Sequence, residues 1–229
     1  PRTPDLSTLS KVAQASSKIK IPVQRLTLPR SDYRVEWATL EYLLGEELAS
    51  KGHSFDDEAT DLILDPDSSV NGYHCENTLF NGLFALLFWD VLFAPLPGAF
   101  FNPFQAGPAD LYRPDFVSRR EGVIEQTLST LNDGTYQSII QKNRADKFGL
   151  ACSLVHWPML SERFVDSALE CIPALHLKSV FKHLLKDFRN HRRGMPDLVI
   201  FNRDARTYRL LEVKGPGDRL QDNQRLWFD

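Results

Sequence analysis

The segment Gly194–Gln224, GMPDLVIFNRDARTYRLLEVKGPGDRLQDNQ, constrains the fold more than any other part of the 229-residue chain. After a Gly-Met-Pro break comes the apolar, β-rich run Leu198–Phe201, and a second β-rich run covers Thr207–Val213. The polar residues Asn202–Arg206 between them have the composition of a turn. The segment therefore predicts a β-hairpin.

The hairpin brings together residues that can hold a metal. With its loop at 203–206, position 202 pairs with 207, so Asp197 lies opposite Glu212. Side chains alternate along a strand, so Glu212 and Lys214 share a face and Val213 points into the core. Two facing carboxylates repel unless a cation lies between them, and a hard divalent cation prefers oxygen ligands. The alternative is a solvated hairpin in which Lys214 and Glu212 form a surface salt bridge, because D-x14-E-x-K also arises by chance.

Lys214 and a further acid complete the candidate site. Lys214 is expected to orient or deprotonate a water, or to stabilise charge on a phosphate. The further acid is Glu76, at the start of the apolar stretch Glu76–Phe93, which predicts one long buried helix. Asn77 and Asn81, one turn apart, are candidates to support it. The alternative is that Glu76 only complements the helix macrodipole.

The rest of the chain is mostly helical in pattern. Residues 1–34 predict an extended arm or linker with a strand near 23–28, and the acidic stretch 56–72 predicts turns with one helical turn at 59–64. Ser118–Glu121 spells a capping box. In the loop 99–117, Asn102, Gln105 and Asp110 are expected to satisfy loop carbonyls rather than to bind phosphate. Helices are predicted over 36–51, 76–93, 118–131, 136–147, 161–171 and 175–190, and the final residues 223–229 look like a helix cut short, which indicates a fragment of a longer protein.

Charge is distributed unevenly along the chain. The net charge is −3 with a pI of about 6.1, which argues against a protein that coats DNA nonspecifically. Between Lys178 and Arg225, however, the sequence contains twelve Lys and Arg but only six Asp and Glu, so this stretch has a net charge of +6 and the remainder −9. Local basicity around a carboxylate site suits a polyanionic substrate. The alternative is a solvated helix face.

The sequence also argues against a protein held by zinc or disulfides and against one that spans a membrane. The three cysteines, Cys75, Cys152 and Cys171, are odd in number and lack zinc spacing, so they indicate buried thiols in a reducing compartment. The apolar run Leu83–Phe93 is interrupted by Asp90 and is too short to span a membrane. No membrane association is expected.

Several separate motifs resemble one nuclease family. RGMPDLVIF, LLEVKGPGDRL and the Gln224 of DNQRLW resemble the VRR-type nuclease domain of the PD-(D/E)xK superfamily. YHCENTLFNGLFALLFWD, NPFQAGPADL and FVSRR resemble the Fanconi-anaemia-associated nuclease family in a bacterial-type version, over residues 35–229. The resemblance implies an α/β, restriction-endonuclease-like core with a mixed sheet flanked by helices, a helical N-terminal elaboration and a truncated C-terminus.

The resemblance also implies a function and roles for individual residues. It implies a structure-specific DNA nuclease that cuts 5′ flaps and resects 5′ to 3′ in interstrand crosslink repair, with flapped or branched DNA as its partner. Mg²⁺ or Mn²⁺ would be bound by Glu76, Asp197, Glu212 and the carbonyl of Val213, with Lys214 as the catalytic lysine and Gln224 as a supporting residue. The expected location is the bacterial cytoplasm and nucleoid, or the nucleus in a eukaryote.

DNA contacts are expected from three arginines. Arg192, Arg193 and Arg219 are the candidates, and Arg192 and Arg219 lie where family members hold a 5′-phosphate. Asn223 stands where some relatives have lysine. The alternatives are a Holliday-junction-resolvase-like or restriction-type nuclease of the same superfamily, and a non-catalytic DNA-binding module.

Overall fold

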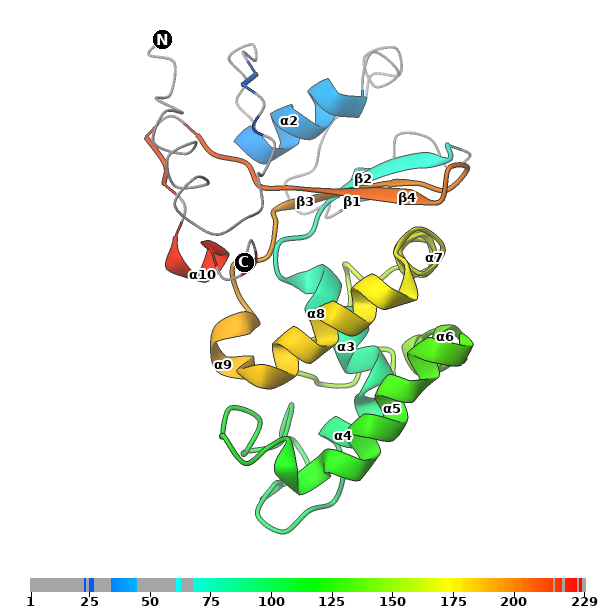
Figure 1. Ribbon diagram of the computed structural model, residues 1–229, viewed down its shortest axis with the longest axis vertical. Helices are drawn as coiled ribbons and strands as arrows, with labels where there is room; N and C mark the ends of the chain where they lie inside the picture. The colour runs from blue at the N-terminus through cyan, green and yellow to red at the C-terminus, as the bar shows by residue number, and fades with distance from the viewer. Residues whose placement is uncertain are drawn as a thin grey trace. The chain divides into compact units, whose positions relative to one another are not determined.

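The computed structural model describes residues 23, 25–26, 34–44, 61–62, 68–215, 217–219, 221–225 and 227. The chain divides into two compact units (Figure 1): residues 1–77, 193–204 and 208–229 form the first, and residues 78–192 and 205–207 form the second. Most of the arm expected over 1–34, its strand, and the end of the helix expected over 36–51 lie outside the described residues.

The first unit is built on a sheet with the strand order β1-β2-β3-β4. Its strands are β1 (Asp61–Leu62), β2 (Val70–His74), β3 (Leu198–Asn202) and β4 (Thr207–Leu211). β2 runs antiparallel to both β1 and β3, with His74 opposite Leu198. Strands β3 and β4 are neighbours in this sheet, which confirms the predicted hairpin. The mixed sheet is not seen among the described strands, whose β1–β2 and β2–β3 pairs are both antiparallel.

Strands β1 and β2 correct two sequence predictions. Asp61–Leu62 is a strand instead of part of a helical turn, and the turn-like sequence Val70-Asn71-Gly72 lies in the strand β2. Pairing with a neighbour on each side overrides the low β propensity of Asn and Gly. Gly72 also has a packing reason, because a Cβ there would lie 2.7 Å from Cδ2 of Leu40.

Helix α2 (Val35–Leu44) covers one face of this sheet (Figure 1). Leu40, Leu198 and Ile200 form the buried centre of the interface. Val213 packs against the same cluster, which confirms that its side chain points into the core. Because Val213 packs into this cluster, its neighbours Glu212 and Lys214 point to the opposite face of the chain after β4.

The second unit is helical. Its helices are α3 (Thr78–Leu87), α4 (Trp89–Leu92), α5 (Glu121–Asp133), α6 (Tyr136–Asp146), α7 (Glu162–Cys171), α8 (Ala174–Lys186) and α9 (Phe188–His191), with a 3₁₀ turn, η2 (Ser118–Arg120), before α5. Phe84 is fully buried at its centre, stacked on Phe88 at a centroid distance of 4.4 Å and edge-on to Phe181 at 5.7 Å. This cluster holds α3 against α8.

Three helix predictions need correction. The helix expected over 76–93 begins at Thr78 and breaks at Phe88, and the helix expected over 175–190 breaks at Asp187, whose side chain caps α9. The capping box is wrong. The hydroxyl of Ser118 donates to the carbonyl of Asp115, so the helix begins only after the 3₁₀ turn, at Glu121.

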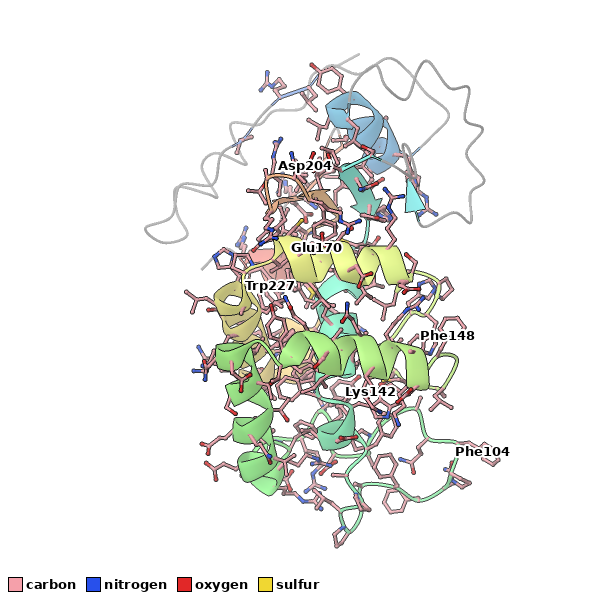
Figure 2. All side chains as sticks on the ribbon, turned by 90° about the vertical axis from the view of Figure 1, so that its right-hand side faces the viewer. Phe104, Lys142, Phe148, Glu170, Asp204 and Trp227 are labelled. Atoms are coloured by element: carbon pink, nitrogen blue, oxygen red, sulfur yellow. The ribbon has the colours of Figure 1, made fainter. Side chains whose placement is uncertain are left out.

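The long loop before α5 is held by a buried ion pair. Both carboxylate oxygens of Asp110 accept from the guanidinium of Arg120, at 2.9 and 3.0 Å, and Arg119 also donates to Asp110. Gln105 accepts from the backbone N–H of Phe101 and donates to loop carbonyls. The prediction that these polar residues satisfy loop carbonyls is confirmed for Gln105 only, because Asp110 accepts from arginines and Oδ1 of Asn102 accepts from the backbone N–H of Phe104. Phe104 at its tip points outward (Figure 2) and is 88% exposed.

None of the three cysteines forms a disulfide with another cysteine. Cys75 and Cys171 are buried as predicted, but Cys152 is only partly buried, so the prediction is wrong there. In the described part of the chain, no helix combines the length and apolarity that crossing a bilayer requires.

Candidate metal centre

Asp197 comes directly before β3, and Glu212 and Lys214 follow β4. Oδ2 of Asp197 accepts a hydrogen bond from the backbone N–H of Val213 at 2.8 Å. Nζ of Lys214 lies 2.5 Å from Oε1 of Glu212, and their side chains are only 15% and 10% exposed. The alternative of a solvated surface salt bridge is therefore wrong, because the pair is buried.

Gln224 reaches Glu212 from the short helix α10 (Asp222–Arg225). Its side-chain Nε2 donates to Oε1 of Glu212, the same oxygen that pairs with Lys214. Oε1 of Gln224 in turn accepts from the backbone N–H of Gln221 at 2.9 Å. Two donors thus converge on one oxygen of Glu212.

Whether a cation fits here depends on the other carboxylate oxygen of Glu212. Oε2 of Glu212 is buried, and none of the residues that the structure describes donates a hydrogen bond to it. A buried carboxylate oxygen without a partner is costly, and a divalent cation with oxygen ligands would remove that cost. The residues present therefore fit a metal ion held by Glu212 together with Asp197.

The electrostatics of the two acids point the same way. Burial raises the pKa of Glu212 to about 7; Lys214 acts against this rise and the facing Asp197 adds to it. Burial also raises the pKa of Asp197, Lys214 opposes the rise, and the charges of Glu36 and Glu76 add to it. Two acids that both resist ionisation would be stabilised as anions by a cation between them.

Glu76 is connected to Asp197 through the backbone. It precedes α3 in a turn with φ 37°, and the N–H groups of Cys75 and Glu76 donate to the carbonyl of Asp197 at 2.8 and 3.0 Å. The Glu76 side chain is 56% exposed, with Oε1 3.6 Å from Nε2 of His74. Within the part of the chain that the structure describes, no three His, Cys, Asp or Glu side chains are grouped closely enough to hold a metal. The role of Glu76 as a ligand stays a prediction.

The asparagines near Glu76 bind other groups. Oδ1 of Asn77 accepts from the backbone N–H of Met195 at 3.2 Å, in the segment that leads to Asp197. Nδ2 of Asn81 donates to the carbonyl of Arg192 at 2.8 Å. Both bonds hold backbone groups, and among the described residues neither side chain forms a hydrogen bond with Glu76.

The three candidate arginines have different surroundings. Arg193 and Arg219 are exposed, as a residue that contacts DNA must be. Arg192 is partly buried, with its guanidinium 5.0 Å from the centre of the Tyr112 ring. Their roles toward DNA stay predictions.

Sequence reasoning did not single out two features. The first is Glu36, whose negative charge helps to raise the pKa of Asp197. Glu36 is spaced four and eight residues from Leu40 and Leu44, which pack against Gly72, and this helical spacing was the sequence signal for its position. In the second unit, a cavity of about 440 Å³ includes Arg113 and Arg189 in its lining. Arg189 lies within the basic stretch, but Arg113 has no comparable signal.

Known proteins similar to this chain belong to one nuclease family. Residues 131–229 match the family model of the VRR-NUC domain. The chain is 44% identical over 203 residues to the Fanconi-associated nuclease 1 homolog of Pseudomonas aeruginosa, covering 89% of this chain and 32% of that protein. It is 35% identical over 162 residues to the Fanconi-associated nuclease 1 of Homo sapiens, covering 69% of this chain and 16% of that protein.

A solved structure is also similar. The crystal structure of paFAN1 bound to 1-nucleotide 5′-flap DNA with a gap matches with a TM-score of 0.73 and 40% identity, covering 89% of this chain and 33% of that one. The chain thus spans about a third of the bacterial relatives it matches. The likeness supports an α/β nuclease fold.

Proposed function

Because this chain belongs to the Fanconi-associated nuclease family and contains its VRR-NUC domain, we propose that it is the catalytic part of a nuclease that cleaves 5′-flap DNA with Mg²⁺ or Mn²⁺. The observation that carries the proposal is the largely buried cluster of Asp197, Glu212 and Lys214, in which Oε2 of Glu212 accepts no hydrogen bond from the described residues. The 5′-flap DNA bound to two similar structures supports the substrate class.

The acids and the lysine would have different roles in the reaction. Asp197 and Glu212 would hold the cation with Glu76 and the carbonyl of Val213, since all four offer oxygen ligands. A bound divalent cation neutralises charge on the scissile phosphate and makes water more acidic. Lys214, fixed against Glu212, orients the attacking water or stabilises the charge that develops on phosphorus. The P–O3′ bond breaks and leaves a 5′-phosphate.

Gln224 holds the carboxylate of Glu212 in one orientation. By donating to Oε1, it keeps that oxygen paired and would leave Oε2 available to a cation. A side chain that is held before the ion arrives loses less entropy on binding it. Gln224 therefore supports the site without touching the reacting atoms.

DNA binding would use basic side chains of both units. Arg193 and Arg219 are exposed, Arg192 is stacked on Tyr112, and all three can pair with phosphate. Cleavage of flaps fits a role in interstrand crosslink repair on chromosomal DNA, in the bacterial cytoplasm or the eukaryotic nucleus. Binding should weaken steeply with salt because phosphate contacts release counterions.

Cleavage of a 5′-flap duplex, with a four-way junction alongside, tests the proposal. The complete protein is compared in Mg²⁺, Mn²⁺ and EDTA, together with Lys214→Ala and the control Lys142→Ala, which removes an exposed lysine paired with Asp146. Metal-dependent incision near the flap, lost only in Lys214→Ala, is the expected result. Symmetric cutting of the junction would support a resolvase instead. Tight DNA binding without any incision would support a non-catalytic module.

A further inference from the structure

Gly194 lies directly against the backbone of α10. Its φ is 81°, and a Cβ built on it would lie 2.5 Å from the carbonyl carbon and oxygen of Asn223 and 2.7 Å from the nitrogen of Gln224. These are backbone atoms, so no side-chain rotation can relieve the overlap. Only glycine lets α10 come this close.

The segment around Gly194 is anchored to both parts of the site. The carbonyl of Arg193 accepts from Nε1 of Trp227 at 3.0 Å, just beyond α10. The N–H of Met195 donates to Oδ1 of Asn77, the residue after Glu76. Asp197 follows two residues later. The segment thus joins the backbone of the acidic residues to the helix that presents Gln224.

We infer that Gly194 is a positioning residue of the site: the close approach that it permits places α10 so that Gln224 can hold Glu212. The inference rests on the proposed nuclease function for its effect on catalysis. Its structural part concerns only whether the Gln224 amide reaches Oε1 of Glu212. An added methyl group at position 194 would push α10 away and break that bond.

Gly217 provides a matched control in the same unit. It also has a positive φ, 95°, but a Cβ there would meet nothing within 4 Å. Gly194→Ala and Gly217→Ala therefore share the cost of alanine in a left-handed conformation. Only Gly194→Ala adds the collision with α10.

The first readout does not depend on nuclease activity. In the complete, metal-free protein, the NMR resonances of the Gln224 side-chain amide are identified by their absence in Gln224→Ala. We expect them to shift toward the free-amide position in Gly194→Ala and to stay unchanged in Gly217→Ala. Unchanged resonances in Gly194→Ala would overturn the inference. If Gly194→Ala does not fold, Trp227→Phe removes the bond to Arg193 without a collision and should produce the same shift; an unchanged position would again overturn it.

The second readout is flap cleavage by the single and double variants. We expect Gly194→Ala and Gln224→Ala to lower kcat by factors that agree within about twofold, and the double variant to be no worse than either. KM for DNA should change little, since neither residue is proposed to contact DNA. Multiplied losses in the double variant would overturn the inference. If the wild type does not cleave DNA, the proposed function fails, and the amide resonances still decide the role of Gly194.

Discussion

The backbone N–H of Val213 donates a hydrogen bond to Oδ2 of Asp197 at 2.8 Å. This bond ties the chain after β4 to the residue before β3, at the open end of the hairpin. The donor is main chain, so the bond does not depend on the side chain at position 213, but its acceptor is the functional carboxylate of Asp197. The bond therefore holds that carboxylate beside the residue that follows Glu212.

Replacing Asp197 by Asn should remove activity while keeping the fold. Asn can still accept from Val213, but it lacks the charge that a cation requires, so kcat should fall by roughly 100-fold or more. Flap cleavage in Mn²⁺ measures the loss, and circular dichroism checks folding. Asp204→Asn, at an exposed position of the hairpin turn, is the control and should keep wild-type activity. Equal activity of both variants would contradict the role of Asp197.

The stability of the metal-free protein should depend on the protonation of Glu212. Its pKa is raised from 4.5 to about 7 in the folded state, so between these pH values the folded protein holds a proton that the unfolded chain has released. Stability from this group is therefore complete below pH 4.5 and is lost as the pH rises through about 7. Urea unfolding in EDTA should show wild type losing stability relative to Glu212→Gln across this range. A constant difference between the two proteins would contradict the prediction.

Metal binding should become tighter as the pH rises toward neutrality. A proton must leave Glu212, whose pKa is about 7, before its carboxylate can hold a cation. For one released proton, Mn²⁺ affinity should rise about tenfold per pH unit below that pKa and then level off. Isothermal titration with Mn²⁺ in two buffers of different ionisation enthalpy counts the released protons. An affinity that is independent of pH would show that Glu212 is already ionised.

Breaking the buried ion pair of the second unit should be costly. Although burial raises it, hydrogen bonds and charges from Arg120 and Arg119 hold the pKa of Asp110 below its ordinary value. Asp110→Ala leaves these guanidinium groups without their acid, and should destabilise the protein by about 3–5 kcal/mol in urea unfolding. Asp115→Ala, which breaks an exposed pair with Arg113, should cost about 0–1 kcal/mol. Similar losses in both variants would contradict the structural role of Asp110.

Phe84 should be a main source of stability in the same unit. It is fully buried against Phe88, Phe181 and Phe188, so Phe84→Ala should cost about 3–5 kcal/mol of unfolding free energy. Phe101 is 77% exposed, and Phe101→Ala should change stability by less than about 0.5 kcal/mol. Thermal and urea unfolding of the two variants measure the difference. A large loss for Phe101→Ala would show that the loop tip packs against another part of the protein.

The local sequence determined the hairpin and the residues placed around it. Two β-rich runs flanking a polar turn are sufficient to pair β3 with β4, and strand alternation then puts Glu212 and Lys214 on one face and Val213 in the core. These features depend on contacts between residues close in sequence. The proximity of Asp197, Glu212 and Lys214 could therefore be predicted without a tertiary structure.

Only the tertiary structure decided the contacts between distant segments. β2 is a strand because β1 and β3 supply its hydrogen bonds, which overrides the turn-like sequence Asn71-Gly72. Gln224 reaches Glu212 because Gly194 admits α10, and the burial that raises the pKa of Glu212 comes from the packed chain around it. Local sequence sets which conformations a segment prefers. Desolvation and close packing depend on every segment that surrounds a residue, so they exist only in the folded protein.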